Sequence, residues 1–162
     1  MERLNRMIQG EAFREHLVRT QAEEKERIYC KHGMDHLLGV ARIAYAYLLE
    51  REEVSSKPQF KELVYAAALL HDLGRWVEYK TGEDHAQASV RLAKPLLIEA
   101  GFQVDEVETI LDAIMEHRQE TGHTSVLARA LALADDWARD CGNCSAQGTC
   151  HKFSPEMLNI TY

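Results

Sequence analysis

The sequence predicts an all-α protein, a compact helical bundle of about six helices. Along most of the chain, apolar residues recur every three or four positions, as they do on the buried face of a helix. No stretch alternates apolar and polar residues in the manner of a half-exposed strand. A chain of 162 residues can bury a core without disulfides. We expect a single domain over residues 1–162, with a helical arm at 1–29, a core at 30–139 and a cysteine-containing loop at 140–162.

The net charge and the apolar content of the chain limit the kinds of partner that it can bind. The formal net charge of −7 argues against general binding to a nucleic-acid polymer or an anionic membrane, although it permits a local basic pocket for a phosphorylated small molecule. The sequence has neither a long uncharged apolar run nor a charged and then apolar leader. We therefore expect a soluble cytoplasmic protein. The composition says nothing about the oligomeric state.

The first half of the chain predicts three helices. Residues 2–29 carry apolar positions among charged ones, and Gly10 is a point at which this segment can divide. A second helix is expected over 34–53 because its apolar residues follow helical spacing. A third is expected over 58–72, with Pro58 as a favourable first helical residue. This third helix is apolar almost all round, which is typical of a central helix.

The second half predicts a loop and three more helices. Residues 74–84 are polar and aromatic, and we expect them to form a loop along one wall of a pocket. Helices are expected over 84–100, 104–118 and 125–139 because each stretch has a continuous apolar face. Pro95 lies inside the first of these and should kink or split it.

Histidines and carboxylates fall on, or at the end of, the apolar faces of these helices. The adjacent pair His71-Asp72 ends the central apolar run, and His117 continues the buried stripe of its helix. Asp135 lies one and two turns after buried leucines, so that it faces inward and Asp136 does not. The full set is His36, His71, Asp72, His85, His117 and Asp135.

A metal centre explains this set better than six separate core hydrogen bonds. Any one of these residues alone would more simply be a buried polar group with a protein partner. Together they need many partners at once, which divalent ions supply. Nitrogen and oxygen ligands suit Fe, Mn, Zn, Co or Ni. Six ligands exceed the need of one catalytic ion, so we expect one or two ions, with Asp72 as the bridge if there are two.

The sequence resembles the HD-domain superfamily of metal-dependent phosphohydrolases. The resemblance covers about residues 30–139 and is carried by His36, by His71-Asp72 in LLHDLGR and by Asp135 in ALADDW. It implies an all-α bundle in which these four residues bind the first metal. His85 in GEDHAQAS and His117 in IMEHR resemble the subset whose two extra histidines hold a second metal together with Asp72. That subset includes cyclic-dinucleotide phosphodiesterases and a hydrolase of diadenosine tetraphosphate; the chain lacks the GYP element of the former.

By this reading the protein is a phosphohydrolase of a nucleotide or another small phosphorylated compound, acting through a metal-activated hydroxide. Asp72 and Arg75 are the catalytic candidates. Asp72 would bind and position the metal ions, and the Arg75 guanidinium would bind a substrate phosphate. Candidate substrate contacts are Arg75, Trp76, Tyr79 and Arg118. Two alternatives stay open, a di-iron oxygenase on the same fold and a non-catalytic sensor that binds a nucleotide or metal.

The cysteines form a second motif. Cys141 and Cys144 form a C-x-x-C motif with two residues between them, and Cys150-His151 follows. Such a spacing commonly begins a tetrahedral metal site. The fourth ligand is either His151 or Cys30. We favour Cys30, Cys141, Cys144 and Cys150 around a structural zinc, with an iron–sulfur cluster as the next choice and reduced thiols in a loose tail as the competing interpretation. His32 is open between a role in supporting the metal centre and none.

Overall fold

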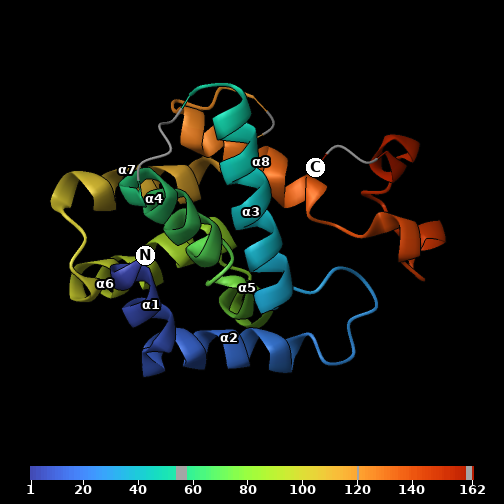
Figure 1. Ribbon diagram of the computed structural model, residues 1–162. Helices are drawn as coiled ribbons and strands as arrows, with labels where there is room; N and C mark the ends of the chain where they lie inside the picture. Colours follow the sequence, from blue (N-terminus) through green and yellow to red (C-terminus); the bar gives the residue numbers. More distant parts are fainter. Residues whose placement is uncertain (54–57, 120, 160–161) are drawn as a thin grey trace.

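The computed structural model describes residues 1–53, 58–119, 121–159 and 162. Across these ranges the chain forms eight α-helices, three short 3₁₀ turns and no strand, which confirms the all-α class (Figure 1). The α-helices are α1 (Glu2–Gln9), α2 (Glu11–Glu23), α3 (Met34–Glu50), α4 (Pro58–Leu70), α5 (Arg75–Thr81), α6 (His85–Ala100), α7 (Val104–Glu116) and α8 (Val126–Trp137). The 3₁₀ turns are η1 (Cys141–Asn143), η2 (Gln147–Thr149) and η3 (Pro155–Leu158).

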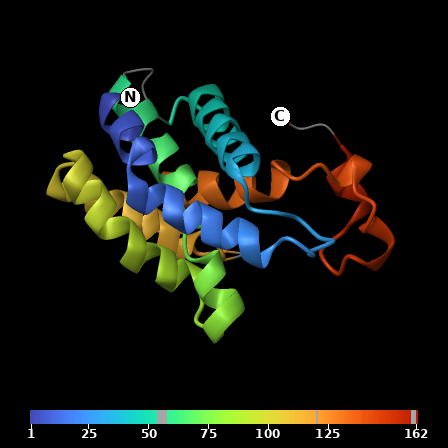
Figure 2. The same ribbon diagram turned by 90° about the horizontal axis from the view of Figure 1, so that it is seen from below.

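Helix α4 lies at the centre, as its uniformly apolar sequence predicts. The run from Ala66 to Leu70 is completely or almost completely buried. Around it, α4 packs against α3 and α7, α3 also packs against α8, and α6 covers α7. Helix α1 closes one end of this bundle against α4 and α6, and α2 runs along the outside next to α5 (Figures 1 and 2). In the described part of the chain, no helix is long and apolar enough to cross a bilayer.

The N-terminal arm is shorter than the sequence predicts. Gly10 adopts an extended conformation and separates α1 from α2, as its position allowed. The predicted helix to residue 29 is wrong, because α2 ends at Glu23. Beyond that residue the Glu24 carboxylate turns into the protein, where it accepts a hydrogen bond of 2.8 Å from the backbone N–H of His32. The chain from 24 to 33 is therefore a loop folded around a buried acid.

The predicted loop at 74–84 is also wrong, because its first part is the helix α5. Seven residues are too few to show a helical period, but local contacts stabilise the turn. Arg75 and Glu78 pair at 2.9 Å one turn apart, and Gly82 ends the helix with a φ of 77°. Pro95 does not split its helix, because α6 continues through it from His85 to Ala100.

Gly74 sets the close approach of α5 and α6. Its backbone N–H donates a 2.8 Å hydrogen bond to the Ser89 hydroxyl. A Cβ at this position would lie 2.6 Å from the Ala88 Cβ and 2.6 Å from the His85 carbonyl oxygen, which is inside van der Waals contact. Only glycine lets the backbone after Asp72 lie directly against the first turn of α6. That contact carries His85 to the centre of the protein.

Candidate metal centre

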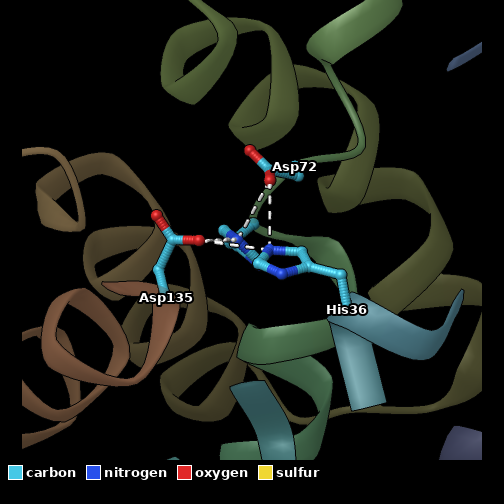
Figure 3. A group of neighbouring side chains, drawn as sticks. His36, Asp72 and Asp135 are labelled. Atoms are coloured by element: carbon cyan, nitrogen blue, oxygen red, sulfur yellow. Dashed lines mark ion pairs between the residues drawn. The ribbon is translucent and has the colours of Figure 1, made fainter. Parts of the chain in front are cut away.

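Four side chains from three parts of the fold converge on one point. They come from α3, from the turn after α4 and from α8: His36, His71, Asp72 and Asp135. One ligand atom of each lies within 4.8 Å of those of all the others. His36 Nε2 is 3.1 Å from Asp135 Oδ1, and His71 Nε2 is 3.2 Å from Asp72 Oδ2. The two carboxylates point toward the His36 ring from different sides (Figure 3).

A second group shares Asp72 with the first. Asp72, His85 and His117 also offer ligand atoms within 4.8 Å of one another. His85 Nε2 lies 3.3 Å from Asp72 Oδ1 and 3.2 Å from His117 Nε2. Asp72 therefore directs Oδ2 to the first group and Oδ1 to the second. A carboxylate with one oxygen toward each of two groups is suited to bridge two ions.

The outer nitrogens of the rings fix their orientation. His71 Nδ1 lies 2.7 Å from the Ala68 carbonyl oxygen, and His117 Nδ1 lies 2.6 Å from that of Ile114. Because a carbonyl can only accept, each Nδ1 carries the hydrogen. In the neutral ring, Nε2 then presents its lone pair to the centre. This is the arrangement in which proteins hold histidine ligands of metals.

Glu78, which the sequence analysis did not single out, fixes His85 in the same way. Its Oε2 accepts hydrogen bonds of 2.9 Å from His85 Nδ1 and of 2.9 Å from Arg75. Arg75 also donates to Asp72 Oδ1 at 2.9 Å. Arg118 approaches Glu78 Oε1 at 3.4 Å. The Glu78 carboxylate therefore connects His85 to two arginines. The sequence did not predict this role, because the helix α5 that carries Glu78 was itself not expected.

Three donor atoms at the centre are buried and make no hydrogen bond of good geometry, although carboxylate or imidazole atoms lie 3.1–3.7 Å from them. Among the residues that the structure describes, these orphaned atoms include Nε2 of His36, Nε2 of His71 and Oδ2 of Asp72. Buried polar atoms without partners are rare, since each costs about 1–3 kcal/mol. Three of them directed at one point fit a cation that binds nitrogen and oxygen. The residues present thus fit the one or two divalent ions expected from the sequence.

The electrostatics of the two groups differ, since the first group favours a positive charge and the second does not. Burial lowers the pKa of His71, but the carboxylates of Asp72 and Asp135 outweigh it and raise that pKa to about 10. Against the effect of burial, His71 and Arg75 hold the pKa of Asp72 well below its usual range. Burial lowers the pKa of His85 to about 4 and that of His117 to about 3. The first group therefore holds a proton where a metal would bind, whereas the second is neutral and ready to coordinate.

A cavity of about 340 Å³ opens beside both groups. Its walls include His85, His117 and Asp135 together with four cationic side chains: Arg75, Arg118, Arg139 and Lys152. The structure therefore places two predicted substrate contacts, Arg75 and Arg118, at this cavity. The sequence analysis missed Arg139 and Lys152. Arg139 follows Asp135 by one helical turn and bonds it at 3.0 Å, a spacing that could have revealed it.

The two aromatic candidates for substrate contact lie elsewhere, between α5 and the N-terminal arm. Trp76 packs between α5 and α2, with its ring 5.9 Å from that of His16 and the Arg19 guanidinium 4.6 Å above it. The Tyr79 hydroxyl donates to Glu24 Oε1 at 2.8 Å. Neither residue lines the cavity beside the metal centre. Both are occupied in holding α5 against the N-terminal arm.

His32 gains a definite place from the same arm. It is buried, its Nδ1 pairs with Glu24 Oε1, and its Nε2 lies 3.7 Å from Asp72 Oδ2. A chain of contacts therefore runs from Tyr79 through Glu24 and His32 to the shared carboxylate. Glu24 stands in a run of charged residues that reads as a solvated helix face, so the sequence held no signal for it. Of the two roles left open for His32, the structure favours support of the centre.

The four cysteines are brought together. All of them line one cavity with the loop before α3, whereas His151 does not line it and is exposed. The geometry favours Cys30 over His151 as the fourth member. None of the four forms a disulfide, and all are half-buried. Burial and the neighbouring thiols of Cys30, Cys144 and Cys150 raise the pKa of Cys141.

The chain from residue 33 to residue 140 matches the family model described as the HD domain. The chain belongs to the HD domain family. The candidate ligand set His36, His71, Asp72 and Asp135 lies entirely within the matched range, in the order that the resemblance to this superfamily implied. The family assignment drawn from the sequence is therefore confirmed.

Two proteins are similar to this HD domain over most of its length. A protein of Clostridium beijerinckii, named only as uncharacterized, is 32% identical over 151 residues, which cover 93% of this chain and 92% of the relative. A crystal structure described as that of a predicted HD superfamily hydrolase, from an uncultured Thermotogales bacterium, is 31% identical with a TM-score of 0.57. That match covers 75% of this chain but only 65% of the other.

Proposed function

We propose that this HD domain protein is a metal-dependent phosphohydrolase that acts on a nucleotide or another small phosphorylated compound. One observation carries the proposal: Asp72 turns its two oxygens to two groups of ligands, beside a cavity with four cationic side chains. Paired ions next to fixed positive charge suit the displacement of a phosphate ester. The solved relative described as a predicted hydrolase supports the same class of reaction.

The roles follow from the two groups. His36, His71, Asp72 and Asp135 would hold one ion, and Asp72, His85 and His117 the other. Bound divalent ions lower the pKa of a water ligand toward about 7 and neutralise phosphate charge. Asp72 is the residue on which both depend. Glu78 and the carbonyls of Ala68 and Ile114 keep the rings in place, so that the centre is formed before the substrate arrives.

The cationic side chains would bind the phosphate. Arg75 and Arg139 each pair with carboxylates of the centre, which holds their guanidinium groups rigidly at the cavity wall. Among the described residues, Lys152 has no carboxylate within 4.0 Å and is exposed at the same cavity. Its charge is available to an incoming anion. A cavity of about 340 Å³ matches the lower end of small-ligand sites, roughly 300–1,000 Å³.

A turnover assay on the full chain tests this function. The purified protein, loaded separately with Mn, Co, Zn or Fe, is offered mono-, di- and cyclic nucleotides, and phosphate or nucleotide products are measured. Asp72→Asn should abolish turnover and metal retention with helicity unchanged. Asp112→Asn, at an exposed position on α7, is the matched control and should behave as the unaltered chain.

Three results would overturn the proposal. Oxygen consumption with an iron-loaded protein, without hydrolysis of any phosphorylated compound, would favour a di-iron oxygenase. Saturable nucleotide binding without turnover under any metal would favour a sensor. Retained metal and turnover in Asp72→Asn would refute the assignment of the centre itself.

A further inference from the structure

The C-terminal segment from Cys141 to Leu158 returns to the loop that precedes α3. Figure 2 shows this segment beside the loop between α2 and α3, although more than a hundred residues separate them in sequence. Cys30 comes from that loop; Cys141, Cys144 and Cys150 come from the C-terminal segment. All four line one cavity of about 400 Å³. The chain has no other cysteine.

This segment has almost no hydrophobic core of its own. Its three short turns contain no buried residue, and Ala146 is the one buried apolar side chain between Cys141 and Asn159. Its backbone bonds are local: the N–H of Cys144 donates to the Cys141 carbonyl at 3.4 Å, and that of Cys150 to the Gln147 carbonyl at 3.3 Å. Compact turns of this kind need a cross-link when hydrophobic burial is lacking. The cysteines supply the groups for one.

The spacing of the sulfurs distinguishes between two kinds of cross-link. A zinc ion binds sulfur at about 2.3 Å, which places tetrahedral ligands roughly 3.8 Å apart. Yet no three of these described cysteines have sulfurs within 4.8 Å of one another. A cavity of about 400 Å³ is also more than ten times the roughly 30 Å³ of one water molecule. The cavity that the four thiols share with other side chains therefore has room for a group larger than a single ion.

We propose that Cys30, Cys141, Cys144 and Cys150 bind an iron–sulfur cluster, which ties the C-terminal segment to the loop before α3. In a [4Fe–4S] cluster each thiolate would bind a separate iron at a corner, so the four sulfurs would stand farther apart than around one ion. Two cationic side chains, Lys31 and Arg139, line the same cavity, as do the carboxylates of Asp35 and Asp140. The four cysteine ligands are distinct from the ligands of the histidine and aspartate centre, although His36 and Arg139 line both surroundings. The proposal does not depend on the proposed hydrolase activity.

The test is the acid-labile sulfide of the full chain purified without oxygen. The histidine and aspartate centre contains no sulfide, so sulfide reports on the cysteines alone. The cluster predicts sulfide in amounts equal to the iron that remains in Asp72→Asn, a broad visible absorption, and bleaching of that absorption by dithionite. These readings on the cysteine-intact chain do not depend on whether any cysteine variant folds.

Variants then assign the ligands. Cys30→Ser should lose the sulfide and the visible absorption, whereas His151→Ala, at an exposed neighbour of Cys150, should keep both. One zinc per chain without sulfide would overturn the cluster in favour of a single-ion site. Protein with neither sulfide nor a metal at the cysteines would overturn the site altogether. Full sulfide in Cys30→Ser would refute the four-cysteine set.

Discussion

Raising the pH should strengthen metal binding at the group formed by His36, His71, Asp72 and Asp135. In the metal-free protein the pKa of His71 is raised to about 10, so its ring carries a proton at neutral pH. A metal binds only the neutral ring, so this proton must leave. Because pH 7 lies about three units below this pKa, removing the proton at pH 7 costs roughly 4 kcal/mol, at about 1.4 kcal/mol per unit.

The affinity of the first ion should therefore rise about tenfold per pH unit between about pH 7 and 9. The second group behaves differently, because burial lowers the pKa values of His85 and His117 to about 4 and about 3, and these rings are already neutral. The stability of the metal-free protein should change in the opposite sense. A raised His71 pKa contributes stability that is complete below about pH 6.5 and is lost as the pH rises toward 10.

Isothermal titration calorimetry with Mn in two buffers of different ionisation enthalpy measures the affinity of the first ion and the number of protons released when it binds. We expect about one proton to be released with the first ion. A His71→Gln variant should bind more weakly and release none. An affinity that stays flat across this pH range, with no proton released, would refute the reasoning because it would mean that His71 is neutral in the metal-free protein.

Three further predictions concern the surroundings of the centre. Glu78→Gln should weaken the ion held by His85 and His117 about 10–100-fold in metal titrations and leave the first ion unchanged; equal losses at both would contradict a selective role. Gly74→Ala places a Cβ 2.6 Å from backbone and side-chain atoms of α6 and should lower the free energy of unfolding in urea by about 1–3 kcal/mol. The control Gly148→Ala, with nothing within 4 Å of its Cβ, should leave that free energy unchanged. Equal unfolding midpoints for the two variants would refute the close approach at Gly74. Lys152→Ala should raise KM for a phosphorylated substrate with kcat nearly unchanged, and a change confined to kcat would count against phosphate binding.

Helical phase accounts for the part of the centre that the sequence predicts. His117 continues the buried stripe of α7, and Asp135 rather than Asp136 faces inward because it lies one turn beyond Leu131. The structure brings both to the predicted partners. These residues sit on or directly after regular helices, where spacing along the chain determines direction in space.

The residues that support the ligands were not predictable in this way. Glu78 lies on a seven-residue helix that is too short and polar to show periodicity, and Glu24 acts from a loop that the arm was not expected to contain. Each is defined by a contact with a residue distant in sequence or in another element, such as Glu24 with Tyr79 at 2.8 Å. Tertiary contacts of single polar side chains leave no pattern in a sequence.

The central claim is that Asp72 joins two metal ions. The most direct measurement is anomalous X-ray scattering from crystals of the Mn-loaded chain, which locates each ion without reference to activity. The account predicts two ions about 3.5–4 Å apart, one beside His36, His71 and Asp135 and the other beside His85 and His117, with one oxygen of Asp72 on each. A single ion that leaves His85 and His117 unbound, or ions that do not contact Asp72, would contradict it.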